Sequence, residues 1–524
     1  MSVTSESPLT AMSGIELARA IAAGDVSAVE AVDAHIARIE AVNPRLNAVV
    51  FTRYDEARAE ARAADERRGR GETLGPLGGV PVTIKEALDL VGTPSTYGLP
   101  SRAKSLATED DLYVARLRAA GAVILGKTNV SQLLLYTESD NPLYGRANNP
   151  WNLDRTPGGS SGGQAAIIAA SGSPLGLGTD IGGSIRVPAA YCGIAGIKPT
   201  AGRLPDFAAF GMPLGQNAIS SQVGPLARTV GDVALTLEIL NGGRAPSVEP
   251  PAPLGDPASV DIASLRVAYY TDDGTFAPAR AVARAVTEAA GYLAGRGAQV
   301  TEWRPPEVER AEDIFYGVFS ADGGRGAREF LGRDPRDPRI GRLVALAGLP
   351  RPLIAAAASA LRVSGQRTQA TVARNFGYKD TLHYWRLVEA QMAYKRRFQQ
   401  ALDEDPGGPF DLIICPPTAL PAIRHGGSAD LVTGGAYATL FNVLGYPAGI
   451  APVSAVRPDE EQPRKRAADV AQRAARRAEE GSAGLPLAAQ VVARPWREHV
   501  ALAAMFAIEE AVAAQGGMPS PQAV

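Results

Sequence analysis

Histidine and cysteine are scarce in this sequence of 524 residues. The two cysteines, Cys192 and Cys415, are too few for a disulfide framework, and no C-x-x-C pair indicates zinc. A reducing compartment therefore fits best, and we expect a cytoplasmic protein. The four histidines are scattered without the spacing of metal ligands, at His35, His383, His425 and His499. Their scarcity also weakens any mechanism that needs a Ser-His-Asp triad.

The sequence also lacks an excess of one charge and long apolar runs. A formal net charge of −2 gives no reason to expect a nucleic acid or an acidic membrane as a partner. No run of about 18 uncharged apolar residues is present, so we expect no integral membrane segment. The amino terminus has neither the basic nor the apolar part of a signal peptide. With 45% apolar residues the chain can still bury a large core, which is typical of a soluble globular protein.

The patterns along the chain favour a helical start followed by an α/β domain. Residues 13–68 carry apolar side chains at helical spacing, with glycine and proline at the breaks. The pattern then changes to a short buried strand over 80–84, at the end of which lies Lys85. Residues 264–303 read as strand, helix and strand in turn. We therefore expect an α/β fold in which a large mixed β-sheet is covered by α-helices on both sides.

Two glycine-rich motifs suggest functions that their surroundings do not support. Gly121 to Thr128 matches the phosphate-binding pattern G-x-x-x-x-G-K-[ST], which needs a strand before its first glycine. Here a helical segment precedes Gly121 and the variable positions, A-V-I-L, form a strand sequence, so we reject a nucleotide site. Gly158 to Gly162 matches G-x-S-x-G, the nucleophile elbow of the α/β-hydrolases. A turn sequence leads into it instead of a strand, and no histidine stands out as its partner.

Two serines in glycine-rich loops are the strongest candidates for chemistry. Ser160 lies in T-P-G-G-S-S-G-G and Ser184 in G-T-D-I-G-G-S-I-R-V-P. Glycines before Ser184 allow backbone N–H groups to converge. The N–H groups of Ile181, Gly182 and Gly183 could then hold the oxyanion that forms when Ser184 attacks a carbonyl carbon. A helix beginning after Ser184 would add the positive end of its dipole. Taken alone, either loop is better explained as a flexible glycine-serine turn.

A serine that has no histidine needs another base, and a buried lysine can act as one. Its amine must be neutral, which requires a pKa lowered from about 10.4 to roughly 7–8 by burial. Lys85 follows an apolar strand, a setting that it shares only with Lys127 and Lys198. By itself it would be read as a surface lysine at a strand end. Ser160 supplies a small hydroxyl that could bridge Lys85 and Ser184.

Read together, three motifs resemble the amidase signature family of serine hydrolases: G-V-P-V-T-I-K, G-G-S-S-G-G and G-T-D-I-G-G-S-I-R-V-P. Similarity of the flanking sequence runs over about 14–240 and 409–512. The resemblance implies a Ser-cisSer-Lys triad in which Ser184 is the nucleophile, Ser160 relays a proton after a cis peptide bond, and Lys85 is the base. It also implies residues that orient the loops, at Ser161, Thr179, Asp180 and Arg186.

Several details are most similar to the fatty acid amide hydrolase branch of that family, including the sequence S-D-N-P-L-Y-G-R-A-N-N-P-W. This similarity implies that Leu134 and Leu135 line an acyl channel beside Ser184. Residues 348–362 fall where the membrane-bound members of that branch have an apolar segment that docks on the membrane, but here these residues are mainly alanine. We therefore expect an ordinary helix pair or a homodimer contact there.

The resemblance also implies the amidase signature fold and a division of the chain. We expect a helical region over 1–70 that packs on the core, and then a single amidase signature domain over 71–524. The parts expected within that domain are a catalytic core over about 75–240, a variable substrate-pocket region over about 245–408, and a carboxy-terminal return to the core over 409–524. A charged stretch over 457–480 is expected to be an exposed helix.

These features predict an amidase that hydrolyses a fatty-acyl or aryl/alkyl amide to an acid and an amine or ammonia through a Ser184 acyl-enzyme. A small-molecule amide is the expected partner, and neither a metal nor an organic cofactor is needed. An aryl-acylamidase or a carbamate hydrolase of the same family is the nearest alternative. Less favoured are the glutaminase subunit of a tRNA-dependent amidotransferase, a catalytically silent binding protein and a nucleotide-binding protein. The sequence does not fix the acyl chain or the leaving group.

Overall fold

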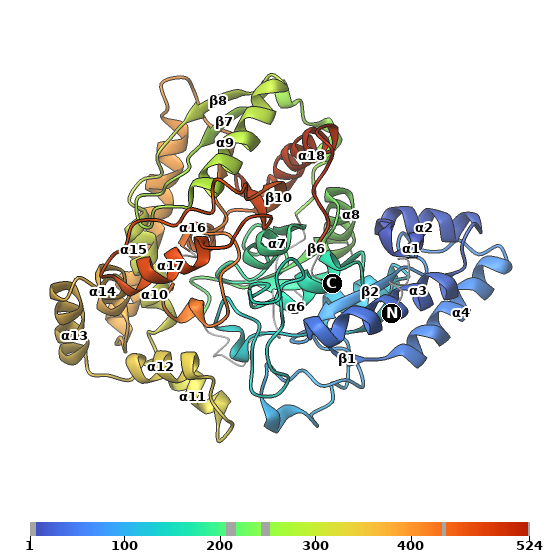
Figure 1. The fold of residues 1–524 in the computed structure, drawn as a ribbon, viewed down its shortest axis with the longest axis horizontal. Coiled ribbons are helices and arrows are strands. Elements are labelled where there is room, and N and C mark those ends of the chain that lie inside the picture. Colours follow the sequence, from blue (N-terminus) through green and yellow to red (C-terminus); the bar gives the residue numbers. More distant parts are fainter. Residues whose placement is uncertain (1–6, 206–215, 243–251, 432–435, 522–523) are drawn as a thin grey trace.

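An eleven-stranded mixed sheet forms the centre of the protein (Figure 1). The computed structural model describes residues 7–205, 216–242, 252–431, 436–521 and 524. The strand order is β1-β3-β2-β4-β6-β5-β10-β11-β9-β7-β8. The strands are β1 (Val49–Thr52), β2 (Pro81–Lys85), β3 (Val123–Thr128), β4 (Leu175–Asp180), β5 (Ala195–Lys198), β6 (Gln222–Ala227), β7 (Arg266–Tyr269), β8 (Gln299–Glu302), β9 (Leu412–Cys415), β10 (Ala448–Ala455) and β11 (Pro486–Ala493).

Eighteen α-helices are present in the described part of the chain, with α1–α4 on the opposite side of the molecule from α11–α14 (Figure 1). They are α1 (Pro8–Ala11), α2 (Gly14–Ala23), α3 (Ala28–Leu46), α4 (Tyr54–Gly69), α5 (Leu112–Ala119), α6 (Gly162–Ala169), α7 (Arg186–Cys192), α8 (Val230–Asn241), α9 (Arg280–Gly295), α10 (Val308–Phe319), α11 (Arg325–Leu331), α12 (Pro338–Ala347), α13 (Arg351–Val363), α14 (Arg367–Asn375), α15 (Thr381–Asp403), α16 (Ala436–Leu444), α17 (Val470–Glu479) and α18 (Glu498–Ala514).

The sheet is covered on both faces, as the sequence predicts. Every residue of β2, β3, β4, β6 and β11 is buried. Because successive side chains of a strand point to opposite faces, burial at every position requires cover on both sides. The prediction of an α/β fold with a mixed sheet is therefore confirmed.

Two neighbouring parallel strands position the candidate site. β2 and β4 pair in parallel, with Thr83 opposite Gly176 and Ile84 opposite Leu177. Their carboxyl ends therefore lie at the same edge of the sheet, where ligands bind in many α/β folds. β2 ends at Lys85, and β4 ends at Asp180 and continues into the loop that carries Ser184. The topology thus brings together two motifs that lie far apart in the sequence.

The amino-terminal region contains one strand that the sequence pattern did not indicate. α2 and α3 begin with capping boxes, Ser13 with Glu16 and Ser27 with Glu30, as expected of helices. Between α3 and α4 the chain forms β1, which pairs antiparallel with β3. The side-chain oxygen of Asn43 accepts hydrogen bonds from two successive N–H groups and holds the turn into β1. A four-residue strand is too short for periodicity to reveal.

The prediction of an exposed helix over 457–480 is wrong in two respects, the length of the helix and its exposure. Only α17, over Val470–Glu479, is helical in this stretch. One face of α17 is buried through four alanines, Ala471, Ala474, Ala475 and Ala478. Their spacing of three and four residues marks a buried helix face within a strongly charged segment.

The pattern over Gly121 to Thr128 is not a phosphate-binding loop. β3 occupies Val123–Thr128, so the residues that would wrap a phosphate form a strand inside the sheet. The preceding element is helix α5, as the sequence predicts. The amine of Lys127 is fully buried and donates to the carbonyl of Pro94 and the hydroxyl of Ser95.

Helices α12 and α13 form a bent pair at the periphery. Only Ile354 and Ala358 of α13 are buried, whereas Leu353 and Val363 are exposed. Among the described helices, none alone combines the length and apolarity needed to cross a bilayer; α12 and α13 meet those criteria together but bend by 119° at their junction. The sequence predicts a helix pair or a homodimer contact over 348–362, but that segment holds α13 alone, since α12 ends at Ala347. The first residues of the substrate-pocket region predicted over about 245–408 lie outside the described residues, at 245–251.

Candidate active site

Lys85 and Ser160 form a direct contact in the interior of the protein. The Nζ atom of Lys85 donates to Ser160 Oγ at 2.8 Å and to Thr179 Oγ1 at 2.7 Å. Lys85 is completely buried, and Ser160 and Thr179 are each 1% exposed. Thr179 lies in β4, beside the strand that ends at Lys85. The parallel pairing of β2 with β4 therefore places the amine beside Thr179, and the same amine contacts the first serine loop at Ser160.

The backbone around Ser160 is held by Ser139. The Gly159–Ser160 peptide bond is cis, as the family resemblance implies. The N–H of Ser139 donates to Gly158 O at 3.0 Å, and its hydroxyl donates to Ser160 O at 3.2 Å. The same hydroxyl accepts the N–H of Gly162 at 2.9 Å. Ser139 thus binds both ends of the loop that presents the Ser160 side chain.

The loop over Ile181 to Ser184 joins β4 to α7. Gly183 has φ +105°, and a Cβ atom there would lie 2.9 Å from the Cβ atom of Ala438. Only glycine fits this position, since other residues disfavour positive φ and add the clashing atom. The carbonyl of Ser184 accepts the N–H of Ser161 at 3.2 Å, so the two serine loops contact each other. The hydroxyl of Ser161 has no hydrogen-bond partner among the described residues.

Asp180 organises the turn that precedes Ser184. Its carboxylate accepts the N–H groups of Gly183 at 2.9 Å and Ile185 at 3.1 Å. The sequence predicts that the N–H of Gly183 binds an oxyanion, but in the structure this N–H already donates to Asp180. A substrate oxygen would have to share the donor with Asp180. The N–H groups of Ile181 and Gly182 are the other two expected donors.

Arg186 neutralises Asp180 in the protein interior. Both side chains are 0% exposed, and the Nη2 atom of Arg186 lies 3.0 Å from Asp180 Oδ1. Burial alone would raise the pKa of Asp180, but the Arg186 guanidinium outweighs burial and holds that pKa well below its usual range. The guanidinium also donates to Asn442 Oδ1 and Gln490 Oε1. The turn before Ser184 is thereby tied to α16 and β11.

Three buried lysines fit the sequence criterion for a base, and their contacts distinguish them. Burial lowers the pKa of Lys127 to about 8 and that of Lys198 to about 7. Lys198 Nζ donates to Pro199 O, and Lys127 Nζ donates to Pro94 O and Ser95 Oγ. Of the three, Lys85 is the one whose amine contacts Ser160. Burial is common to all three, so geometry selects Lys85.

The histidines do not supply a base for either serine. The ring of His35 bonds to Ala31 O, that of His383 to the Asp380 carboxylate, and that of His425 to Leu153 O. The ring of the fourth histidine, His499 on α18, packs against Gly255. The residues before Ser160 form turns, and helix α6 begins at Gly162. The G-x-S-x-G match therefore lacks the strand and the histidine that a nucleophile elbow requires.

A cavity of about 180 Å³ reaches Ser184. Its described lining is largely apolar and comes from the segment at 134–137, the Ser184 loop, and helices α10 and α12. The expected pocket residues Leu134, Leu135 and Ile181 lie in this lining together with Gly182. Asp322 is the one carboxylate among the described lining residues. The cavity can hold an apolar group attached to a carbon that Ser184 attacks.

Sequence reasoning missed several residues that support the site. Ser139 lies in the stretch S-D-N-P-L-Y-G-R, which resembles the family but does not by itself indicate a role for this serine. Asn442 and Gln490 lie more than 250 residues from their partner Arg186, as the sequence separations of 256 and 304 show. No local sequence pattern indicates such partners, because they contact Arg186 only after the sheet has formed.

Glu312, on α10 behind the pocket wall, should make stability depend on pH. Its side chain is 3% exposed, and burial raises its pKa from 4.5 to about 8. The folded state thus retains a proton that the unfolded state releases, so stability falls as pH rises from about 4.5 to about 8. Glu312→Gln should therefore melt several degrees higher than the wild type at the upper end of this range and equally at the lower end, measured by circular dichroism.

The matched control is Glu309→Gln, on the exposed side of the same helix. It should leave the pH dependence of the melting temperature unchanged. An equal gain from Glu312→Gln at both ends of the range would show that the carboxyl group does not change its protonation on unfolding.

The site combines two serines in glycine-rich loops with a buried lysine that contacts one of them, and three of the four histidines are bonded elsewhere. This combination is typical of a hydrolase that works without histidine. The family model for Amidase matches residues 30–502, and the chain belongs to that family. It is an amidase, a hydrolase that acts on amide C–N bonds. The resemblance predicted from the three motifs is confirmed.

The relatives differ in what they act on. Fatty-acid amide hydrolase 1 of Sus scrofa is 35% identical over 463 residues, or 85% of this chain and 77% of that protein. A glutamyl-tRNA(Gln) amidotransferase subunit of Roseiflexus castenholzii is 35% identical over 434 residues, or 81% and 84% of the two chains. A solved fatty acid amide hydrolase structure matches with a TM-score of 0.82 over 97% of this chain and 86% of that chain. Its 24% identity makes this a likeness of fold.

Proposed function

We propose that this amidase cleaves amides of apolar carboxylic acids through an acyl-enzyme on Ser184. The oxygen of Ser184 attacks the amide carbon and forms the C–O bond, while its proton passes through Ser160 to neutral Lys85. The proton then returns through Ser160 to the leaving nitrogen as the C–N bond breaks. Water attacks the ester carbon in the second half, and the acid leaves with Ser184 restored.

The contact between Lys85 Nζ and Ser160 Oγ at 2.8 Å carries this proposal. A general base must lie within hydrogen-bond reach of the proton that it takes, either directly or through one bridging group. Complete burial withholds the water that stabilises an ammonium ion, which favours an uncharged amine. Ser161 and Ser184 share a backbone hydrogen bond, so the bridging hydroxyl and the nucleophile belong to adjoining loops.

The developing oxyanion would be held at the loop before Ser184. The N–H groups of Ile181 and Gly182 are the proposed donors, with Gly183 contributing when its bond to Asp180 is shared. The Asp180–Arg186 pair fixes this turn, and Thr179 Oγ1 accepts a hydrogen bond from the Lys85 amine. Such donors stabilise charge because they are in place before the reaction begins.

The pocket favours an apolar acyl group of moderate size. Leu134, Leu135, Phe315 and Phe319 line the cavity, and its volume of about 180 Å³ lies below the range of about 300–1,000 Å³ that is usual for drug-sized ligands. A medium alkyl chain or a single aryl ring fits such a space. This keeps both the fatty-acyl and the aryl-acylamidase interpretations open, as well as a carbamate with the same apolar part.

The glutaminase alternative is disfavoured by the charges in the pocket. Glutamine carries an α-carboxylate as well as an α-ammonium, and a site for it would need a cationic partner. Of the described lining residues, the only one with a charged side chain at neutral pH is Asp322, an anion. The relatives alone do not decide this point, because the amidotransferase protein and the fatty-acid amide hydrolase are equally similar to this chain.

A series of p-nitroanilides graded by acyl length tests the proposed specificity. We expect kcat/KM to rise from acetyl to medium acyl chains by roughly threefold to fourfold per methylene, since each buried CH₂ contributes about 0.8 kcal/mol. The rise should stop where the chain exceeds the cavity. The matched control is the anilide of the dicarboxylic acid with the same chain length as the best substrate; it ends in a carboxylate and should be hydrolysed far more slowly. Preference for this acidic substrate, or faster ammonia release from glutamine, would contradict the proposal.

A further inference from the structure

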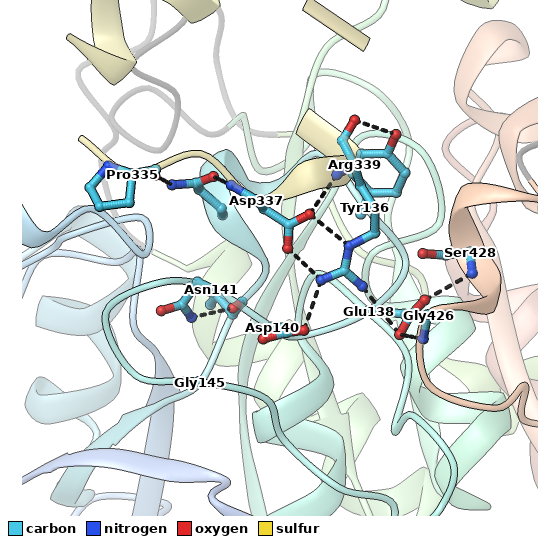
Figure 2. Close-up of polar contacts among 12 residues, drawn as sticks. Tyr136, Glu138, Asp140, Asn141, Gly145, Pro335, Asp337, Arg339, Gly426 and Ser428 are labelled. Atoms are coloured by element: carbon cyan, nitrogen blue, oxygen red, sulfur yellow. Dashed lines mark hydrogen bonds and ion pairs between the residues drawn. The ribbon is translucent and has the colours of Figure 1, made fainter. Parts of the chain in front are cut away.

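Arg339 joins three carboxylates beside the pocket. It lies in the first turn of α12, and its side chain is 10% exposed. Its guanidinium donates to the Asp337 carboxylate and to Asp140 Oδ2 at 2.9 Å, and lies 3.2 Å from Glu138 Oε2. Figure 2 shows the guanidinium between these three groups. A planar fork of N–H donors can bind several carboxylates at once, which a lysine ammonium on a flexible stem does less well.

The same cluster holds two further parts of the pocket wall. Glu138 is 2% exposed, and its two oxygens accept the N–H groups of Gly426 and Ser428, each at 2.8 Å. Tyr136 donates its hydroxyl to the carbonyl of Arg339 at 2.9 Å (Figure 2). Tyr136, Ser428 and three residues of α12 line the cavity at Ser184. Arg339 therefore connects the segment over 134–141, helix α12 and the loop at 426–428.

The cluster also reaches the Ser160 loop through Ser139. Ser139 lies between Glu138 and Asp140, both of which bind Arg339. Its backbone N–H and its hydroxyl hold the carbonyls of Gly158 and Ser160. A movement of Glu138 or Asp140 would therefore displace the two hydrogen bonds that set the backbone at Ser160. These groups lie in the protein interior, since Glu138, Ser139 and Ser160 are each at most 2% exposed.

The charges in the cluster make Arg339 difficult to replace. Three carboxylates face one guanidinium. Its removal would leave three negative charges close together and the buried Glu138 without its cationic partner. Glu138 would then separate from Asp140 and Asp337, or take up water, and in either case the segment around Ser139 would shift.

We propose that Arg339 is a positioning residue. Through one network of ion pairs and hydrogen bonds it fixes the position of α12 at the acyl pocket and the position of Ser160. The inference rests on the proposed function, because it assigns to Ser160 the proton relay from Ser184. The acyl group in the cavity contacts α12, whose position depends on Arg339. The backbone of Ser160, the residue that relays the proton from Ser184, depends on the same guanidinium. Substrate binding and acylation should therefore both depend on Arg339.

The test compares Arg339→Met and Arg339→Lys with the wild type in three measurements below the melting temperature. These are kcat and KM for an acetyl anilide, kcat and KM for a medium-chain anilide, and the rate at which a small fluorophosphonate labels Ser184. We expect Arg339→Met to lower kcat on both substrates and the labelling rate by about 100-fold, the loss that a displacement of about 1 Å can cause. KM should rise for the medium-chain substrate alone. Arg339→Lys should give intermediate values.

Arg284→Met is the matched control. Arg284 lies on α9, and its guanidinium is bound by Glu288 and Glu460, with 15% of the side chain exposed. Its loss should lower the melting temperature and leave the labelling rate unchanged. If Arg339→Met and Arg339→Lys behave in the same way as this control, Arg339 is merely structural and the proposal is overturned.

Asp140→Asn provides a second route if Arg339→Met does not fold. The Asp140 side chain is 36% exposed, so its loss breaks one arm of the network with less risk to folding. We expect a several-fold loss in labelling rate, and an unchanged rate in both Asp140→Asn and Arg339→Lys would overturn the proposal. Absence of Ser184 labelling in the wild type would instead contradict the proposed function, so the two failures are distinguishable.

Discussion

Replacing Ser184 by alanine should abolish amide hydrolysis, with a loss of roughly 10⁶-fold, the order found when the nucleophile of another serine hydrolase is removed. The variant keeps the glycine turn and the Asp180–Arg186 pair, so it should fold and bind substrate normally. Only the oxygen that forms the acyl-enzyme is lost. The measurement is the rate of p-nitroaniline release together with labelling by a fluorophosphonate and identification of the labelled peptide by mass spectrometry.

Identification of the labelled serine separates Ser184 from Ser160. Ser173→Ala is the matched control, since Ser173 is likewise buried but its hydroxyl donates to Leu175 O. It should retain labelling and turnover. Labelling that persists in Ser184→Ala and maps to Ser160 would contradict the proposed nucleophile and restore the nucleophile-elbow interpretation of G-x-S-x-G.

Replacing Lys85 by methionine should slow acylation by about 10²–10⁴-fold, the usual contribution of a general base. Methionine keeps most of the side-chain volume and removes the amine that donates to Ser160 and Thr179. Pre-steady-state release of p-nitroaniline isolates acylation from the later hydrolysis of the ester. The loss should be similar for amides with different acyl groups, because Lys85 acts on the serine oxygen rather than on the acyl chain.

Lys127→Met is the matched control for Lys85. Both lysines are completely buried, and burial lowers the pKa of Lys127 to about 8, but its amine is bound by Pro94 and Ser95. The control should lose stability and retain its acylation rate. Undiminished acylation in Lys85→Met would remove lysine from the mechanism, whatever the control does.

The residues of the candidate triad could be predicted because their surroundings are unusual in the sequence itself. A backbone that turns sharply around a serine requires glycine, and Gly183 shows why, since its positive φ and its contact with Ala438 exclude other residues. The strand before Lys85 is likewise visible as a short apolar run. Neither signal distinguished Lys85 from Lys127 or Lys198, which are buried to the same degree.

The elements that the sequence did not reveal are those whose stability comes from distant partners. β1 exists because it pairs with β3, and the buried face of α17 exists because its four alanines pack inward. The use of the Gly183 N–H by Asp180 is also a matter of tertiary geometry, since the spacing alone left that donor available for an oxyanion.

The sequence by itself determined the family, and its motifs predicted Ser160, Ser184 and Lys85 as the triad, whereas burial alone left three lysines as possible bases. These depend on local backbone requirements and on burial, both of which leave a pattern of glycine and apolar residues. Only the tertiary structure decided that Lys85 contacts Ser160, because the two residues are 75 positions apart and meet once α6, which follows Ser160, packs on β2. It also decided that Arg339 joins the pocket wall to the Ser160 loop, because Arg339 bonds to Asp140 across 199 residues of sequence. Hydrogen bonds and ion pairs between distant residues form only once the sheet has brought them together, so no local pattern records them.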